Sequence, residues 1–402
     1  MRPPRFTGSF TQQPPIPEDA IAAAEAVMRS GRLHRYNVAP GEVSETARLE
    51  EEFARWQGAR YCLAVASGGQ AMQIALRAAG VKPGERVLTN AFTLAPVPGA
   101  IAGIGALPVL VETTDDLVID LDDLAAKARS SGAGVLLLSH MRGHIADMDR
   151  IEAVARAHGL RIIEDCAHTM GARWNGRKSG SFGLAGCFST QTYKHLNSGE
   201  GGLLTTDDAD LMARAVILSG SYMLYERHRA APPAEAFAEV RLDTPNMSAR
   251  MDNLRAALLR PQLARIEDNL AGWNGRHDRI AARLATHPAV RMPSRPPQES
   301  YVGSSIQFRV PALSAAGCTA LLSAAAERGV ELKWFGAAEP AGFTSAHTSW
   351  RYIARHELPQ SERVLATLFD MRIPLTFSLD DCDLIATHIL GALDETLAEG
   401  AR

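Results

Sequence analysis

The sequence predicts an α/β protein: a mostly parallel central sheet with helices on both faces, followed by a smaller C-terminal α/β domain. Three observations lead to this expectation. Between residues 61 and 164, short apolar runs alternate with amphipathic segments at the spacing of βαβ units. A long helical pattern follows from Ser248 to about Asn274, and its length suits a link between two domains. The 402 residues also exceed what one core normally needs. We therefore expect a large domain over residues 1–255 and a small one over residues 256–402.

The elements can be assigned in chain order. Pro17, Glu18 and Asp19 open a first helix whose periodicity runs to Met28, and Gly31 ends it. An extended loop over 32–44 precedes a second amphipathic helix, Ser44 to Trp56. The expected strands of the large domain are Tyr61–Ala66, Arg86–Thr89, Leu107–Val111, Val135–Ser139, Arg161–Glu164, Ala185–Phe188 and Leu203–Thr206. The expected helices among them are Gln70–Ala79, Pro98–Ile104, Leu121–Arg129, Met148–His158 and one from Asp207 to about Leu218.

The second half of the chain is less regular. Residues 221–245 have a local excess of Arg and His and contain Pro232 and Pro233, so we expect irregular structure there. The helix from Ser248 is expected to kink at Pro261. From His277 onward, helix and strand patterns continue around a proline-rich break at 293–297.

Composition excludes several classes of protein. Hydrophobic residues make up 46% of the chain and charged residues 22%, as in ordinary soluble globular proteins. The formal net charge of −3 gives no electrostatic reason to expect nucleic acid or an anionic membrane as partner. No apolar run approaches the ~18 residues of a membrane span, and the proline-rich N-terminus lacks the apolar core of a signal peptide. The five cysteines are odd in number and widely spaced, which favours reduced thiols in a cytoplasmic protein.

A first candidate binding segment is Ser67, Gly68, Gly69 and Gln70, where a strand meets the N-terminus of a helix. Free backbone N–H groups and the helix dipole favour an anion at such a place, and glycines let a phosphate approach the backbone. An ordinary tight turn has the same composition. The segment alone leaves both interpretations open.

A second candidate is Asp165, which comes just after an apolar strand. In an open parallel sheet, ligands bind beyond the carboxyl ends of the strands. An acid there can pair with a protonated ring nitrogen, or it can cap a helix. His168, three residues later, could contact the same ligand or could be a hydrogen-bonded structural histidine.

The third candidate is Lys194, which lies between two strand-like runs, five residues after Ser189 and shortly before the glycines at 199, 201 and 202. Such a lysine can form a Schiff base with an aldehyde cofactor, and the serine hydroxyl can bind a phosphate. The alternative is a solvated loop lysine. Asn246, before the long helix, could offer its amide to an anion.

Other motifs do not support a metal or nucleotide site. His140 and His144 have the spacing of a helical metal pair, but Gly143 lies between them and no zinc-type Glu follows His140. We expect no metal site. The sequence contains no G-x-x-x-x-G-K-[ST] motif and no G-x-G-x-x-G motif after a strand.

Several segments together resemble one family. They are Ser30–Leu33, Val65–Gly69, Gly143–Asp149, Ile163–His168, Gly180–Gly202, Pro245–Met247, Leu358–Pro359 and Ile373–Leu375. With them, the chain from about Pro15 to Leu397 resembles the DegT/DnrJ/EryC1/StrS aminotransferases, the sugar aminotransferase group of pyridoxal-phosphate enzymes. The resemblance implies the aspartate aminotransferase type of fold, the PLP-dependent transferase fold type I.

The resemblance also implies roles for the residues singled out above. Lys194 would hold pyridoxal 5'-phosphate as a Schiff base and then shuttle a proton, while Asp165 would pair with the pyridine nitrogen. His168 would lie beside the ring hydroxyl, where the family usually has Gln. The phosphate would be bound by Ser189 and the turn formed by Ser67, Gly68, Gly69 and Gln70. Asn246 would reach the phosphate of the neighbouring subunit's cofactor, which implies a homodimer with shared active sites.

The chain departs from the family pattern in several places. Gly69 stands where Thr is common, so one hydroxyl contact to the phosphate is lost. The aromatic residue that usually stacks on the cofactor ring falls near Leu94, so either Phe92 takes this role from a shifted register or an aliphatic side chain packs on the ring. A motif that borders the substrate site is replaced by Lys333–Gly336.

The implied activity is transfer of an amino group from glutamate or glutamine to a keto or aldehyde intermediate, on a sugar, cyclitol or related precursor, by a ping-pong mechanism. Two alternatives remain. One is a dehydratase of the same fold that uses pyridoxamine phosphate, in whose relatives a His typically replaces the lysine. The other is a cofactor-binding regulator without turnover.

Overall fold

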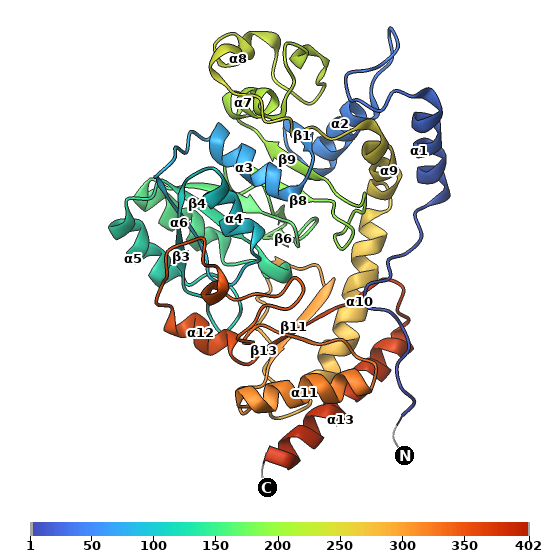
Figure 1. The fold of residues 1–402 in the computed structure, drawn as a ribbon, viewed down its shortest axis with the longest axis vertical. Helices are drawn as coiled ribbons and strands as arrows, with labels where there is room; N and C mark the ends of the chain where they lie inside the picture. Colours follow the sequence, from blue (N-terminus) through green and yellow to red (C-terminus); the bar gives the residue numbers. More distant parts are fainter. Residues whose placement is uncertain (1–2, 401–402) are drawn as a thin grey trace.

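The computed structural model describes residues 3–400. A large sheet flanked by helices occupies one end of the molecule, and a smaller group of strands and helices occupies the other (Figure 1). The helix α10 (Ile266–Leu284) runs between the two ends (Figure 1). We propose that residues 1–255 and 256–402 are the two domains, with this helix in the second.

The large sheet has seven strands in the order β1-β9-β8-β5-β4-β2-β3. All neighbours are parallel except around β9, which runs antiparallel to both β8 and β1. The prediction of a mostly parallel sheet is therefore confirmed. The strands are β1 (Tyr61–Val65), β2 (Arg86–Asn90), β3 (Leu107–Val111), β4 (Val135–Ser139), β5 (Arg161–Asp165), β8 (Ala185–Ser189) and β9 (Gly202–Thr206).

Helices cover both faces of this sheet because successive strand residues point to opposite faces. In β4, Leu136 belongs to one buried cluster and Leu137 to the other. The Leu136 cluster is completed by α2 (Glu45–Gln57), α5 (Leu121–Ser131), α6 (Met148–His158) and α9 (Asn253–Leu263). The Leu137 cluster is completed by α3 (Gly68–Ala78), α4 (Pro96–Gly103) and α7 (Ala209–Ser219). The first helix, α1 (Glu18–Ser30), packs on α9.

Side-chain caps explain where most of these helices begin. Ser and Asp side chains accept a backbone N–H of the first turn, as the sequence leads one to expect for N-caps. These residues are Ser44, Ser67, Asp120, Asp147, Asp208 and Asp252. At the other end, Gly31, Gly58 and Gly159 adopt left-handed conformations that end α1, α2 and α6.

The smaller end is built on a three-stranded antiparallel sheet in the order β11-β13-β12. Its strands are β11 (Ser305–Arg309), β12 (Lys333–Trp334) and β13 (Leu368–Arg372). Apolar residues of this sheet share a buried cluster with those of α10, α11 (Ala315–Glu327) and α13 (Leu379–Gly400). A further small sheet joins β6 (Arg173–Trp174), β7 (Arg177–Lys178) and β10 (Glu299–Ser300), and α12 (Pro359–Leu365) follows the loop after β12.

The long helix expected from Ser248 to Asn274 is wrong in both its start and its break. Ser248 has a positive φ of 52°, and the first helix begins only after the Asp252 cap. Pro261 lies inside α9, and the break comes after it, at Ala264 and Arg265. A proline near the end of a helix removes one backbone N–H donor, so the helix can end within a turn of it. The expected irregular segment 221–245 contains only the short turns η2 (Tyr225–Arg227), η3 (Ala234–Phe237) and α8 (Val240–Asp243).

All five cysteines are buried and unpaired. Among residues 3–400, no helix is both long and apolar enough to cross a bilayer.

One buried carboxylate ties the end of β5 to the loop before β8. Glu164 Oε1 accepts the backbone N–H groups of Phe182 and Gly183 at 2.7 and 3.0 Å. Its Oε2 accepts the N–H of Gly180 at 2.8 Å and lies 2.9 Å from His140 Nε2. The carboxylate is fully buried. Because three backbone donors depend on one side chain, Glu164 fixes the geometry next to Asp165.

We predict that Glu164→Gln lowers the free energy of unfolding by about 3 kcal/mol, because the amide NH₂ would face backbone donors and leave them unpaired. Urea unfolding followed by circular dichroism measures the change. Glu152→Gln is the matched control, since Glu152 pairs with Arg177 at the surface and should change stability by less than about 0.5 kcal/mol. Equal effects of the two substitutions would contradict the role assigned to Glu164.

Candidate active site

The segments that follow β1, β4, β5 and β8 meet at the carboxyl edge of the large sheet. They line a cavity of about 370 Å³. Parallel strands all end at the same edge, so residues far apart in the sequence converge there. Of the residues singled out from the sequence, the following line the cavity: Ser67, Gly68, Gly69, Leu94, Asp165, His168, Ser189 and Lys194.

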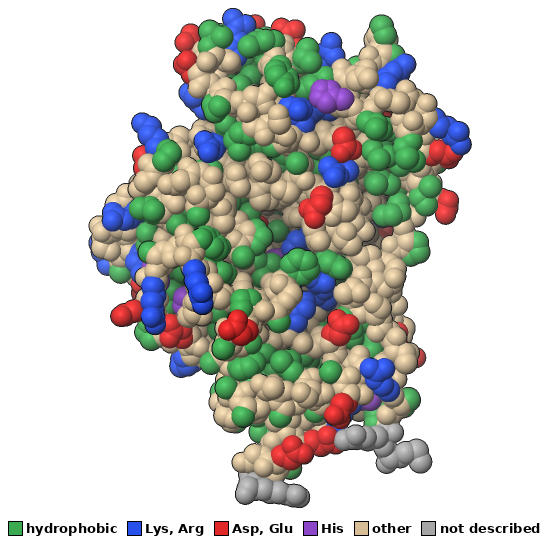
Figure 2. All heavy atoms as spheres, viewed as in Figure 1, with side chains coloured by type: hydrophobic (Ala, Val, Ile, Leu, Met, Phe, Trp, Pro, Cys, Tyr) green, Lys and Arg blue, Asp and Glu red, His purple; other side chains and the backbone are tan. Residues whose placement is uncertain are grey.

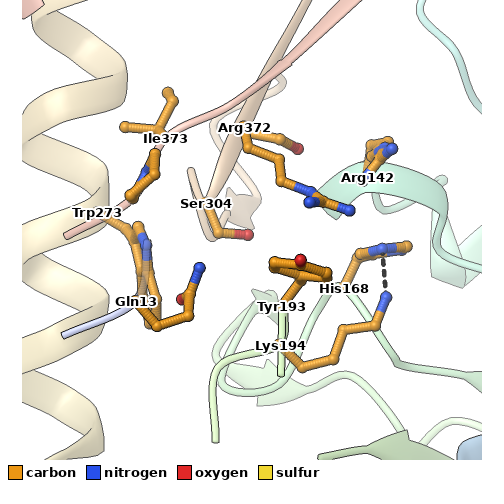
Figure 3. A pocket seen from close by; sticks show the side chains of 11 residues that line it. Gln13, Arg142, His168, Tyr193, Lys194, Trp273, Ser304, Arg372 and Ile373 are labelled. Atoms are coloured by element: carbon orange, nitrogen blue, oxygen red, sulfur yellow. Dashed lines mark hydrogen bonds between the residues drawn. The ribbon is translucent and has the colours of Figure 1, made fainter. Parts of the chain in front are cut away.

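Lys194 and His168 lie together on the cavity wall. Nζ of Lys194 is 2.7 Å from Nε2 of His168 (Figure 3). Burial, with a further contribution from the nearby Arg142 cation, lowers the pKa of Lys194 from 10.5 to about 7, although Asp165 acts in the opposite direction. Burial and the Lys194 charge hold the pKa of His168 well below its usual value. A neutral imidazole can therefore accept a hydrogen bond from the amine, and near neutral pH the amine exists partly in its nucleophilic form.

Asp165 is held in a fixed orientation at the end of β5. Its Oδ2 accepts a hydrogen bond from Ser139 Oγ at 2.9 Å, and its Oδ1 accepts the backbone N–H of Ala167 at 3.1 Å. Ser139 is in turn bound through its backbone to the Asn90 side chain and through its hydroxyl to Thr93. The aspartate thus presents a positioned carboxylate to the cavity.

The turn after β1 presents the N-terminus of α3 to the cavity. Ser67 Oγ accepts the N–H of Gln70 at 3.1 Å. A Cβ atom on Gly68 would lie 2.8 Å from the Ser189 Cβ, so only glycine allows this turn and Ser189 to be so close. The Gln70 side chain does not line the cavity, and this residue contributes its backbone to the turn.

Neither Phe92 nor Asn246 lines the cavity of its own chain. Phe92 is 1% exposed and packs edge-on against Phe335, with ring centroids 5.2 Å apart, so the expectation that it lines the cavity is not met. Leu94, two residues later, takes the place on the wall. Asn246 is exposed, does not line this cavity, and accepts the backbone N–H of Ser248 at 2.8 Å.

Several cavity residues were missed by the sequence analysis. The main ones are Arg142, Tyr193 and Arg372. Ser139, which does not line the cavity but orients Asp165, was missed as well. A second, small cavity of about 20 Å³, near the volume of one water, shares a wall with the first, formed by Arg142, His168, Tyr193, Lys194 and Arg372 (Figure 3). Ser139 could have been found, because it ends a predicted strand; Arg372 could not, because it comes from the distant β13.

The two histidines considered as a metal pair do not share a partner. His140 contacts Glu164, whereas His144 Nε2 lies 2.8 Å from Gln307 Oε1. His140, Glu164 and Cys166 do lie within metal-binding distance of one another. However, Glu164 is already bound by three backbone N–H groups, and burial raises the pKa of Cys166 well above its usual value, which disfavours the thiolate that a metal requires.

The sequence profile of the DegT/DnrJ/EryC1/StrS aminotransferase family matches residues 14–390. The chain belongs to this family. The enzymes of the family depend on pyridoxal phosphate. Membership confirms the predicted resemblance and fits the lysine, aspartate and glycine turn found around one cavity.

Individual family members and structures agree with this assignment. The L-glutamine:scyllo-inosose aminotransferase of Streptomyces griseus is 34% identical over 283 residues, which cover 70% of this chain and 65% of that enzyme. The chain therefore spans just under two thirds of that enzyme. The crystal structure of Streptomyces venezuelae DesV in complex with a ketimine intermediate has a TM-score of 0.76 at 26% identity, covering 93% of this chain and 94% of that one. A Streptococcus pneumoniae structure in its PMP-form has a TM-score of 0.82 at 19% identity, covering 99% of this chain and all of that one, and it supports the fold alone.

The residues of this site fit the cofactor of the DegT/DnrJ/EryC1/StrS family. An amine with a lowered pKa, a positioned carboxylate and a helix N-terminus face one cavity. Gly68 and Gly69 line the cavity at the N-terminus of α3, where the first backbone N–H groups of a helix can bind an anion. Each feature matches one functional group of pyridoxal phosphate.

We predict that in the protein without cofactor, acylation of Lys194 becomes half-maximal near pH 7. The lowered pKa means that the amine is neutral above that pH, so reactivity rises as pH rises through about 7. In the unfolded chain the pKa of Lys194 has its ordinary value of 10.5. Burying the protonated amine therefore lowers the free energy of unfolding at pH values below about 7. This cost decreases as the pH rises from about 7 to 10.5.

Peptide mass spectrometry after pulse acylation measures this profile. Lys178 is the internal control, because burial lowers its pKa only to about 8 and it lies away from the cavity, over the ring of Trp56. A Lys194 midpoint above that of Lys178 would contradict the electrostatics described here.

Proposed function

We propose that this protein is a pyridoxal 5'-phosphate-dependent aminotransferase. It moves an amino group from glutamate or glutamine to a keto or aldehyde group of a sugar, cyclitol or related biosynthetic intermediate, in two half-reactions at one site. The observation that carries the proposal is the convergence of Lys194, Asp165 and the α3 N-terminus on one cavity. The Streptomyces griseus relative, an L-glutamine:scyllo-inosose aminotransferase, supports the substrate class.

Some residues of the site would bind the cofactor, and Lys194 would also transfer protons. When bound, the cofactor supplies an electrophilic aldehyde on a ring that withdraws electrons. Lys194 would hold this aldehyde covalently through its neutral Nζ, and as a free amine it would carry protons within the site. His168 orients Nζ from 2.7 Å away and stays neutral, so it does not compete as an acid.

Binding of the ring and the phosphate involves the remaining residues. Asp165, fixed by Ser139, would keep the ring nitrogen protonated, which maintains the electron demand of the ring. The N–H groups of the 67–70 turn and the Ser189 hydroxyl would hold the phosphate at the positive end of α3. Leu94 and its apolar neighbours Pro96 and Val97 would pack on the ring and exclude water.

We further propose a homodimer with shared active sites in the cytoplasm. Asn246 is exposed, so its side chain is accessible to a neighbouring subunit. Large apolar side chains are exposed in the segment from 222 to 242: Tyr222 at 59%, Met223 at 58% and Leu242 at 77%. Figure 2 shows hydrophobic side chains gathered at this end of the molecule, over α7 and α8. Five unpaired buried thiols suit a reducing compartment.

We predict that purified protein binds pyridoxal phosphate with a visible absorption band that bleaches when glutamate or glutamine is added. Lys194→Ala should abolish that band and lower amino transfer by about 10³-fold or more, because both the attacking amine and the proton carrier are lost. Lys178→Ala, which removes another partly buried lysine of lowered pKa, is the matched control and should leave transfer intact.

Product analysis separates the alternatives. An amine gained by the acceptor supports the aminotransferase, whereas loss of water from the substrate would replace it with the dehydratase. If no amino donor bleaches the bound cofactor, the protein is a regulator. A colourless Lys194→Ala protein that still transfers amino groups would contradict the role of this lysine.

We predict that Asn246→Asp weakens binding of pyridoxal phosphate at least about tenfold, because a negative charge would face the phosphate bound by the partner subunit. Fluorescence titration measures the affinity, and light scattering should give twice the mass of one chain. Thr319→Asp, on the exposed face of α11, adds the same charge away from the site as a control. A monomeric protein whose cofactor affinity is unaffected by Asn246→Asp would rule out the shared site.

A further inference from the structure

Two arginines from different parts of the fold enter the cavity wall next to Lys194. Arg142 lies in the turn η1 (Met141–Gly143) after β4, and Arg372 ends β13 of the small sheet. Both line the large cavity and the small one. In Figure 3 the side chain of Arg372 extends toward Arg142 and toward the His168–Lys194 pair. Neither arginine has a role in the function proposed above.

The backbone of Arg142 has a strained conformation. It adopts a left-handed conformation with φ 55° and ψ 24°, which disfavours a residue with a side chain by about 1–2 kcal/mol. Non-glycine residues in such strained conformations cluster at functional sites. The side chain is 5% exposed, and its Nη2 lies 2.9 Å from Asp370 Oδ2. That contact lacks the alignment of a hydrogen bond, so Nε and Nη2 of Arg142 are buried without a hydrogen-bond partner.

Nearby carboxylates only partly neutralise the positive charge of Arg142 and Arg372. Asp370 is fully buried and its other oxygen accepts a hydrogen bond from Gln307 at 2.7 Å, so it faces away from the cavity and lines neither space. Among residues 3–400, Arg372 makes no ion pair; its guanidinium stacks on the Tyr193 ring, 3.7 Å from the centroid. Burial and the Arg142 charge lower the pKa of Arg372, as expected for neighbouring cations with too little negative charge nearby.

A further cation, Lys333, increases this excess of positive charge. Lys333, on β12 opposite Asp370, has a buried Nζ without a hydrogen-bond partner. Of the carboxylates that line the large cavity, Asp165 is bound by Ser139 and Ala167, and Glu200 is exposed. An anion between the two guanidinium groups would supply the missing charge and the missing hydrogen-bond acceptors.

We propose that Arg142 and Arg372 form an anion-binding site, separate from the phosphate turn at α3, that takes a carboxylate or phosphate group of a substrate while its reacting carbon lies near Lys194. The inference rests on the proposed function, because it places a substrate in the same cavity. A guanidinium presents paired N–H donors that match carboxylate and phosphate oxygens. Two such groups around one cavity select for anionic substrates and against neutral ones of the same size.

The anion has two possible sources. Both half-reactions use the same cavity, so the site can bind the carboxylate of the amino donor, an anionic group on the acceptor, or each in turn. Glutarate, a dicarboxylate that has no amino or keto group and cannot react, is the probe for the first source. Glycerol 3-phosphate is the probe for a phosphorylated acceptor. Using cofactor-loaded protein keeps the phosphate turn at α3 occupied during the titrations.

Calorimetric titration of both probes tests the site in the unmodified protein and in Arg142→Gln and Arg372→Gln. We expect at least one probe to bind and each substitution to weaken that binding about 10- to 100-fold, the loss typical of a charged hydrogen bond. Arg372→Lys keeps the charge and should lose less than Arg372→Gln. Arg279→Gln, which removes a surface arginine paired with Asp383, is the control of equal charge and should change nothing.

The outcomes distinguish the sources and the hypotheses. Weaker glutarate binding identifies a carboxylate, and weaker glycerol phosphate binding identifies a phosphate ester. Binding of both probes unchanged in Arg372→Gln, or no binding of either probe to the unmodified protein, would overturn the proposal. Arg372 makes no ion pair within the described part of the chain, so this variant tests the site even if Arg142→Gln does not fold. If the protein takes up no cofactor, the proposed function fails, and glutarate titration of the cofactor-free variants still decides the anion site.

Discussion

The site depends on how two neighbouring acids at the end of β5 are oriented. Strand geometry sends Glu164 and Asp165 to opposite faces of the sheet. Glu164 is buried and binds three backbone N–H groups of the loop before β8, while Asp165 faces the cavity. Both acids lie on β5. Glu164 therefore fixes the loop that leads through β8 to Ser189 and Lys194, and it is adjacent to Asp165, which would pair with the cofactor ring. A shift of one residue in the register of β5 would exchange the two faces and remove the site.

The burial of this edge also determines its chemistry. Lys194 can act as a nucleophile near neutral pH only because the surrounding protein makes its charged form unfavourable. Arg142 and Arg372 contribute to this effect, and Asp165 and Asp370 oppose it. The amine is thus balanced between cations from two parts of the fold and two carboxylates. The reactivity of Lys194 is a property of the whole cavity rather than of its own loop.

Much of this arrangement could be predicted from the sequence, for a definable reason. Ser67, Asp165, Ser189 and Lys194 each follow closely on a strand of the parallel sheet, so strand prediction alone brings them to one edge. Arg372 lies in a different sheet, and only the docking of β13 against the turn at 141–143 brings it to Lys194. The left-handed backbone of Arg142 has no sequence signal, since an arginine does not normally mark such a turn. The sequence left open whether Phe92 or an aliphatic side chain lies on the wall; Phe92 packs against Phe335, and Leu94 lines the cavity. The start of α9 depended in the same way on the Asp252 cap rather than on helical periodicity.

The contact between Arg142 and Asp370 joins the two ends of the molecule beside the cavity. A hinge motion that separated β13 from the turn at 141–143 would strand two opposite charges in a poorly solvated gap, and such separation is strongly unfavourable. It would also move Asp370 and Arg372 away from the amine, changing its affinity for a proton. The distance between the two halves would therefore influence the protonation state of Lys194.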